Sequence, residues 1–124
     1  LADKIYFAGP VSHVEDMLWA MDFFLFPSLF EGLGIAAVEA QAAGLPVLCS
    51  DKVPPEAQLL STLYALPLEA GVQLWAEKIQ TLREMPVRRE DCAELVRQKG
   101  YDMDDVARMA LKLYQGKPAA EGKR

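Results

Sequence analysis

Two short, continuous apolar runs with a helix-like segment between them constrain the fold of this 124-residue chain more than any other feature. The runs are FFLF at 23–26 and PVLCS at 46–50, and the segment between them, 34–43, carries a single charge, Glu39. Strands that are apolar on both faces are typical of parallel sheets covered by helices. A strand, a helix and a second strand in this order predict a right-handed crossover in such a sheet.

The neighbouring segments extend this alternation of strands and helices. Residues 4–9, KIYFAG, favour β structure and end at Gly9-Pro10, so they predict an earlier strand. Ser12 then predicts the N-cap of a helix. Gly44 predicts the C′ position that closes the helix at 34–43. The apolar face of the helix after Ser12 comprises Val14, Met17, Leu18 and Met21.

The second half of the chain is predicted to be mainly helical. A proline-interrupted connection at 52–61, with one helical turn, leads to a short candidate strand at 63–68. Three helices follow, and Asp102, Asp104 and Asp105 begin the last of them, where they complement the helix dipole. The apolar faces of these helices are Val72, Trp75, Ala76, Ile79 and Leu82; Cys92, Leu95 and Val96; and Met103, Val106, Ala107, Ala110 and Leu113 or Tyr114.

The predicted fold class is α/β, a Rossmann-like parallel sheet with flanking helices. The length suits one domain. A doubly wound sheet usually has five or six strands and this chain offers about four, so the domain is either small or part of a larger one. We expect residues 1–115 to form the folded part. The tail at 116–124, GKPAAEGKR, has no apolar pattern and is expected to fray.

Composition excludes several classes of function. The net charge of −5 and the pI of about 4.8 disfavour nucleic-acid binding. The chain has no run of eighteen apolar residues and no signal-peptide pattern at its start, so we expect a cytoplasmic protein. Cys49 and Cys92 show no spacing of a disulfide framework or a metal site, and we expect both to be reduced. The single histidine, His13, is interpreted as a polar residue at a helix start.

Glu39 is the first candidate for a functional residue. An ionised carboxylate buried in an apolar helix costs several kcal/mol unless it is paired, so Glu39 is expected either to point outward or to have a partner. Helical side chains lean toward the N-terminus. Glu39 is therefore expected to reach back toward the loop that carries Glu31.

The loop before this helix is the second candidate feature. Gly32 and Gly34 allow a ligand to approach the backbone, and the helix start after them favours an anion. Such a loop lies at the carboxyl edge of a parallel sheet, where ligands bind. Carboxylates suit sugar hydroxyls, so a nucleotide sugar fits the pattern. Spacing alone leaves the alternative equally open, an ordinary α/β segment with Glu31 in solvent and Glu39 paired to a cation.

The stretch FPSLFEGLGIAAVEAQAAGLPVLCSD, residues 26–51, resembles the retaining glycosyltransferases of family 4, the group 1 glycosyltransferases. Glu31 and Glu39 fall on the E-x7-E pair of that family. The preceding stretch FAGPVSHVEDMLWAMDFFLFPS looks like the strand and helix that lead into this motif. The similarity runs over residues 4–84 and more loosely to Tyr114, and it looks most like members that build exopolysaccharide or capsule.

The resemblance implies the later part of the C-terminal, donor-binding domain of a GT-B enzyme, a retaining hexosyltransferase. It implies that Glu31 is the catalytic residue that contacts the donor sugar and that Glu39 binds the ribose hydroxyls. The remaining substrate-binding positions that it implies are Gly32, Leu33, Gly34, Ile35, Val11 and Ser12. It implies no metal and no cofactor besides the nucleotide-sugar donor. The glycan or lipid-linked acceptor would bind an N-terminal domain that this sequence does not match, and the parent protein could sit peripherally at the inner face of the membrane.

One departure and two alternatives accompany this resemblance. The family often has Gly-Gly-x-x-Glu after S-D, whereas this chain has DKVPPEAQ at 51–58, so a diphosphate contact from that loop is in doubt. A non-catalytic nucleotide-binding or interaction module, inactive alone and able to self-associate through an exposed apolar face, is the alternative function. A receiver-like flavodoxin fold would need an early acidic cluster and a later lysine at a strand end, which the chain does not arrange.

Overall fold

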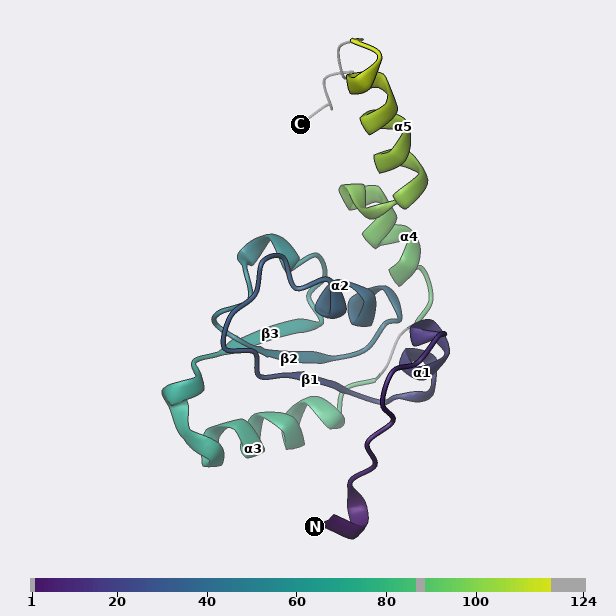
Figure 1. Cartoon of the computed structure of the whole chain (residues 1–124). Coiled ribbons are helices and arrows are strands. Elements are labelled where there is room, and N and C mark those ends of the chain that lie inside the picture. Colours follow the sequence, from purple (N-terminus) through teal and green to yellow (C-terminus); the bar gives the residue numbers. More distant parts are fainter. Residues whose placement is uncertain (1, 87–88, 117–124) are drawn as a thin grey trace.

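The computed structural model describes residues 2–86 and 89–116, and within them it contains a three-stranded parallel sheet (Figure 1). The strands are β1 (Phe24–Phe26), β2 (Val47–Ser50) and β3 (Leu63–Leu66), and they lie in this order across the sheet. β2 is central and buried along its whole length, as the run PVLCS predicts for a strand covered on both faces.

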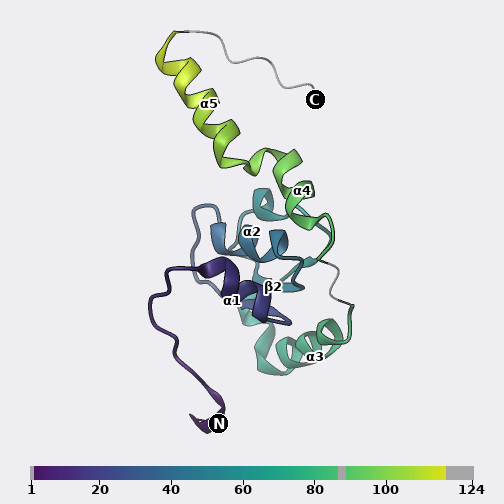
Figure 2. The same cartoon turned by 90° about the vertical axis from the view of Figure 1, so that its right-hand side faces the viewer.

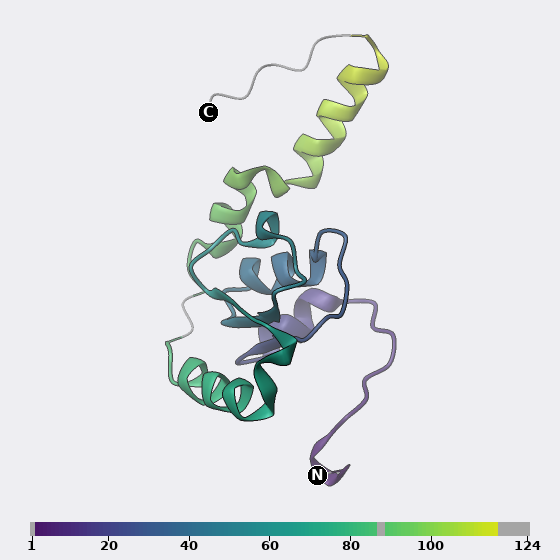
Figure 3. The ribbon, with the colours of Figure 1, turned by 90° about the vertical axis from the view of Figure 1, so that its left-hand side faces the viewer.

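Helices cover both faces of the sheet (Figure 1). α2 lies on one face with α1 beside it, and α3 lies on the other. α4 packs against α2, and α5 leads away from the sheet in all three whole-chain views (Figures 1, 2 and 3). The helices are α1 (Val14–Ala20), α2 (Ile35–Ala42), α3 (Gly71–Arg83), α4 (Cys92–Val96), the π-helical segment Arg97–Tyr101 and α5 (Met103–Tyr114), with 3-10 turns at Ala2–Lys4, Pro55–Ala57 and Leu68–Ala70.

The core lies between the sheet and α2. Leu45, Val47 and Cys49 are buried there in one cluster, and Ala37 and Ala40 present the small side chains that let α2 approach the strands closely. The helix therefore packs on the sheet through its alanines. This explains why the segment that connects β1 and β2 is an apolar helix of small residues.

A polar side chain that the sequence reasoning missed anchors α2 from inside the core. Gln41 is fully buried, and its amide donates to the carbonyl oxygens of Ala37 at 2.9 Å and Ala57 at 2.7 Å. Its side-chain oxygen accepts from the backbone N–H groups of Leu59 at 3.0 Å and Leu60 at 2.9 Å. This one side chain satisfies the backbone of the proline-interrupted connection and ties that connection to α2.

Arg89 also links separate elements, by hydrogen bonds at the C-terminal ends of α1 and α2. Its guanidinium donates to the carbonyl oxygens of Met21 at 2.6 Å and Ala43 at 3.0 Å, the residues that end the two helices. It also lies over the indole ring of Trp19, 5.1 Å from the ring centroid. A cation at the C-terminal ends of two helices complements both dipoles and holds the helices side by side.

The structure contradicts two predictions about the N-terminal segment. Residues 4–9 do not form a strand, because a 3-10 turn at Ala2–Lys4 is followed by a segment without regular structure that runs away from the sheet (Figures 2 and 3). A strand needs a neighbour for its backbone, and no strand of the described residues pairs with this segment. His13, not Ser12, is the N-cap of α1, and no side chain forms a cap hydrogen bond there; its ring instead lies 3.2 Å from Glu15.

Other elements match the sequence prediction in type but differ in burial. The run at 23–26 forms β1 as predicted, yet Leu25 is 44% exposed because the sheet face beneath it is incompletely covered. Leu95 is exposed on α4, while Cys92 and Val96 are buried as predicted, and neither Cys49 nor Cys92 forms a disulfide with a described residue. α5 forms at its predicted place but buries none of its residues. Most of the predicted tail, 117–124, lies outside the described residues.

Candidate functional site

The start of α2 is the best-defined part of the candidate site. β1 ends at Phe26, and the chain crosses the carboxyl edge of the sheet before it enters α2. Gly34, the N-cap, is buried and has φ 78° and ψ 45°, a left-handed conformation that favours glycine. A Cβ atom at Gly34 would also lie 3.1 Å from Cγ1 of Val53. Conformation and packing therefore both require glycine here.

This helix start is open to a ligand. Among the described residues no side chain caps it, and its first turn contains no acidic residue. The first N–H groups of a helix have no partner within the helix, and the helix dipole makes this end positive. Ile35, the first residue of α2, is exposed. The end can therefore accept an anion such as a phosphate group.

Glu31 is held in place by two serines at the ends of two strands. The Ser28 hydroxyl, just beyond β1, donates to Oε1 of Glu31 at 2.8 Å. The hydroxyl of Ser50, the buried last residue of β2, donates to the carbonyl oxygen of Ser28 at 2.5 Å. The carboxylate is thus fixed over the carboxyl edge of the sheet and keeps acceptor capacity for a ligand. Sequence reasoning missed both serines, although a serine at or just beyond the end of each of two strands was the available signal.

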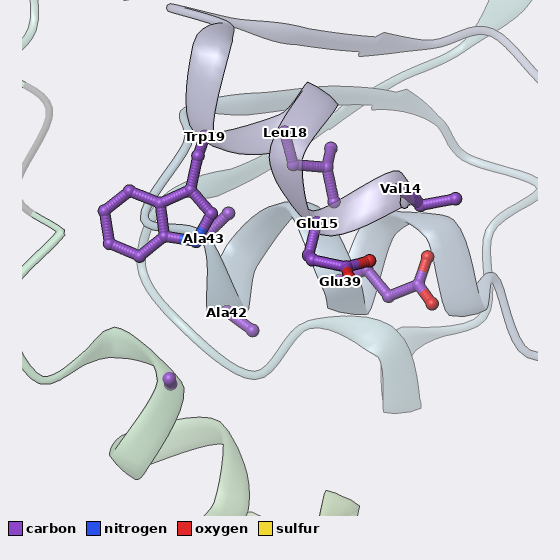
Figure 4. A pocket seen from close by; sticks show the side chains of 8 residues that line it. Val14, Glu15, Leu18, Trp19, Glu39, Ala42 and Ala43 are labelled. Carbon is purple, nitrogen blue, oxygen red and sulfur yellow. The ribbon is translucent and has the colours of Figure 1, made fainter. Parts of the chain in front are cut away.

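Glu39 is exposed and lines a pocket of about 250 Å³ between α1 and α2 (Figure 4). The walls are mostly apolar, and Glu15 of α1 contributes a second carboxylate. The pKa of Glu15 is lowered, chiefly by a backbone hydrogen bond and by its contact with His13. Of the two alternatives expected for Glu39, an outward side chain or a partner, the structure shows an outward, exposed side chain. Glu39 shares this pocket with α1 residues, whereas Glu31 lies on the loop ahead of α2.

The other predicted site residues divide into two groups. Gly32 and Leu33 lie exposed on the loop next to Glu31, so they share the carboxyl edge with the start of α2. Val11 and Ser12 lie exposed in the segment before α1, which runs away from the sheet. The structure therefore gathers the loop residues and the helix start, and it leaves Val11 and Ser12 apart from them.

The connection that departs from the family pattern supports the site from behind. Val53 and Ala57, in the stretch with two prolines, are buried and are the side-chain neighbours that a Cβ at Gly34 would meet. Pro54 and Pro55 lead into the 3-10 turn that Gln41 holds by hydrogen bonds. This loop thus packs against the helix start by apolar contacts.

Within residues 2–86 and 89–116, no three His, Cys, Asp or Glu side chains lie close enough together to hold a metal ion. In the same part of the chain, no helix combines the length and the apolar character that crossing a membrane requires.

Comparison with known proteins gives a consistent result. The sequence pattern of the family described as "Glycosyl transferases group 1" matches residues 1–99. EpsF of Bacillus subtilis strain 168, which carries the name of a glycosyltransferase, is 32% identical over 116 residues, covering 92% of this chain and 30% of EpsF. The lipopolysaccharide core biosynthesis mannosyltransferase LpsB of Rhizobium meliloti strain 1021 is 41% identical over 51 residues, covering 41% of this chain and 14% of LpsB. No solved structure matches the chain significantly.

The parallel sheet with helices on both faces defines a Rossmann-like α/β domain. The chain belongs to the group 1 glycosyl transferases, and the matched region corresponds to the C-terminal domain of the GT-B fold. The chain spans about a third or less of the length of these relatives, 30% of EpsF and 14% of LpsB.

Proposed function

We propose that this chain is the donor-binding part of an enzyme that transfers a hexose from a nucleotide sugar to an acceptor with retention of configuration. The observation that carries the proposal is the open start of α2 at the carboxyl edge, beside the fixed carboxylate of Glu31. The positive helix end suits a diphosphate, and the carboxylates suit hydroxyl groups. Membership of the group 1 family supports the same assignment.

Each site residue has a role in this proposal. The backbone N–H groups at the start of α2, after Gly34, face the diphosphate. Glu31 accepts hydrogen bonds from the donor sugar, and Glu39, at the mouth of the pocket between α1 and α2, accepts them from the ribose. Gly32 and Leu33 line the sugar side.

The chemistry follows from these positions. As the bond to the sugar breaks, charge develops on the leaving diphosphate, and the helix start stabilises it. Glu31 and Glu39 act as binding groups and not as the acid and nucleophile of a glycosidase. In this proposal the transfer needs no metal, because the helix dipole supplies the positive potential.

The acceptor and the biological setting belong to the proposal as well. We infer that a glycan or lipid-linked acceptor binds an N-terminal domain, that the product is a polysaccharide or glycoconjugate, and that the enzyme works in the cytoplasm or at the inner face of the membrane. The names of EpsF and LpsB, a glycosyltransferase and a lipopolysaccharide mannosyltransferase, support this setting. The 124-residue chain alone is expected to bind nucleotide without transferring sugar.

Calorimetric titration of the chain with UDP, GDP and ADP tests the proposal. We expect one of the three to bind, and Glu39→Ala to weaken that binding about tenfold, which corresponds to about 1.4 kcal/mol. Glu84→Ala, at the exposed end of α3, is the matched control and should leave the affinity unchanged. Equal affinity for the Glu39→Ala variant and the parent chain would remove the ribose assignment.

A second candidate function, a non-catalytic interaction module, is favoured by α5. Its apolar residues Val106, Met109 and Leu113 are all exposed, and a helix with an uncovered apolar face can associate with another chain. Light scattering at increasing protein concentration distinguishes the interaction module from the donor-binding domain. A dimer that depends on α5, combined with no nucleotide binding, would favour the module.

A further inference from the structure

An exposed aromatic ring lies beside the candidate site. Phe30, on the loop between β1 and α2, is 86% exposed, whereas Phe24 and Phe26 of β1 pack against the buried core. Burial of a side chain of this size is strongly favourable, so a ring left in solvent offers a large apolar surface to a ligand or a partner. The groups around the ring indicate which chemistry covers it.

The backbone that carries this ring is fixed by hydrogen bonds. The Ser28 hydroxyl lies 3.0 Å from the carbonyl oxygen of Phe30 and 2.8 Å from Oε1 of Glu31, so one group just beyond β1 orders both residues. The hydroxyl of Ser50, buried at the end of β2, donates to the carbonyl oxygen of Ser28. The loop is therefore tied to two strands, while the ring that it carries remains in solvent.

The ring and the carboxylate next to it offer two complementary kinds of contact. The face of an aromatic ring carries partial negative charge and attracts C–H groups as well as apolar surface. The Glu31 carboxylate accepts hydrogen bonds from hydroxyl groups. A ligand that uses both must present C–H groups on its faces and hydroxyl groups around its rim. A hexopyranose ring has this construction.

The position of the ring within the proposed donor site favours the sugar over other groups. A phosphate group is attracted to the start of α2 and gains nothing from an aromatic face. A nucleobase also stacks on aromatic rings. In the proposed function, however, the ribose is bound at Glu39, in the pocket between α1 and α2, and the hexose at Glu31. Phe30, next to Glu31 in the chain, therefore adjoins the sugar end of the donor.

We propose that Phe30 is the stacking platform for a hexopyranose ring whose hydroxyl groups bond to Glu31. This inference rests on the proposed function, to which it adds the residue that holds the apolar face of the sugar. The hexose of a nucleotide sugar and a sugar ring of a glycan acceptor present the same chemistry to the platform, and the two sources are separated by the ligands used in the test.

Calorimetry with paired ligands tests the platform. The ligands are UDP, GDP and ADP and their conjugates UDP-glucose, GDP-mannose and ADP-glucose. In Phe30→Ala we expect about fivefold weaker binding of the conjugate that the chain prefers and unchanged binding of its free nucleotide. Equal weakening of the free nucleotide would overturn the proposal, because the ring would then hold the base.

Further variants separate the aromatic face from its apolar bulk. Phe30→Tyr and Phe30→Trp should keep the affinity for the sugar, whereas Phe30→Leu, which has apolar bulk but no ring, should lose it as alanine does. Leu29→Ala is the matched control, because Leu29 is 83% exposed on the same loop, and it should bind as the parent chain does. Equal losses in Leu29→Ala and Phe30→Ala would overturn the assignment, since any apolar surface on the loop would then serve.

Simple hexosides identify the source of the sugar. Saturation-transfer NMR detects weak binding of the methyl α-glycosides of glucose, galactose and mannose to the chain, with and without nucleotide. A signal that depends on Phe30, with no effect on the conjugates, would assign the platform to an acceptor sugar. An effect on the conjugate alone would assign it to the donor hexose.

The same measurements separate this inference from the proposed function. If the chain binds nucleotide through Glu39 and no sugar ligand depends on Phe30, the platform is overturned and the proposed function stands. If hexoside binding depends on Phe30 in a chain that binds none of UDP, GDP and ADP, the platform stands and the result counts against the proposed function.

Discussion

The starts of α2 and α5 are two helix N-termini that the chain treats in opposite ways. At α5, Oδ1 of Asp102 accepts from the backbone N–H groups of Asp104 at 2.9 Å and Asp105 at 3.0 Å. At α2, the N-cap is Gly34, which has no side chain with which to accept. The α5 end is closed by its own carboxylate, whereas the α2 end keeps its N–H groups available.

The two helices also differ in tertiary support, and here α2 is the better supported of the two. α2 is held by the core and by the hydrogen bonds of Gln41, while α5 stands away from the sheet and buries no residue. A helix that lacks tertiary support depends on its cap, and a helix that is anchored elsewhere can leave its start open. This contrast explains how the fold can present an uncapped helix end at the carboxyl edge of the sheet without losing the helix.

Gln41→Leu should have the largest effect, because it removes the anchor that lets α2 remain uncapped. Leucine has a similar size but leaves the N–H groups of Leu59 and Leu60 buried without an acceptor. We expect a loss of about 3 kcal/mol in the free energy of unfolding, measured by urea denaturation. Gln80→Ala, an exposed change on α3, is the control and should stay within about 0.5 kcal/mol. A small loss in Gln41→Leu would mean that α2 does not depend on this anchor.

Gly34→Ala should have the next largest effect, because it changes the open helix start itself. A non-glycine residue at φ 78° costs roughly 1–2 kcal/mol, and the new Cβ would press on Val53 at 3.1 Å. We expect a loss of about 2 kcal/mol in urea denaturation, with weaker nucleotide binding because the first turn must shift.

Gly32→Ala is the matched control for that change. A Cβ at Gly32 would meet nothing within 4 Å, and its φ lies outside the left-handed region. The expected change in the free energy of unfolding is within about 0.5 kcal/mol. If the two glycine variants behaved alike, the special geometry of Gly34 would not be what keeps the α2 start in place.

Elements with a strong periodic pattern were predictable from the sequence. The runs at 23–26 and 46–50 formed strands and the stretch between them formed α2, because their apolar residues fill the core locally. The acidic start of α5 was predicted correctly from the local run of Asp102, Asp104 and Asp105, and the structure adds that Asp102 caps the helix. The prediction of a strand at 4–9 was wrong. Strand pairing depends on a partner that is distant in the sequence, and a local pattern does not include that partner.

The candidate site was predictable in part for the same reason. Glu31, Gly34 and Glu39 could be selected from spacing and from the resemblance to the family. The links made by Ser50, Gln41 and Arg89 join residues that are far apart in the sequence. Their hydrogen-bond partners are backbone atoms, which every residue carries, so no side-chain pattern in the sequence indicates which residues they join.

Protonation of the Asp102 cap at the start of α5 should have the smallest effect of these changes, and it tests the contrast between the two helix starts. The pKa of Asp102 is lowered, first by the hydrogen bond from the Asp105 N–H and further by the Asp104 N–H and by Arg97 and Arg108. Because the folded pKa lies below the unfolded value, the cap contributes stability above the unfolded pKa of roughly 3.9 and loses it as pH falls through the folded value. Protection of the Asp104 and Asp105 amides from hydrogen exchange should therefore fall below about pH 4.

The variants at position 102 separate the charge from the hydrogen bonds. Asp102→Asn keeps an acceptor oxygen, so the two amides should stay protected and lose most of the acid dependence. Asp102→Ala should expose them at every pH, while the Ala37 and Val38 amides of α2, which bond to the Gly34 carbonyl, remain unchanged. If Asp102→Ala loosened the start of α2 as well, the two helix ends would be coupled, and the division between a self-capped end and a ligand-facing end would not hold.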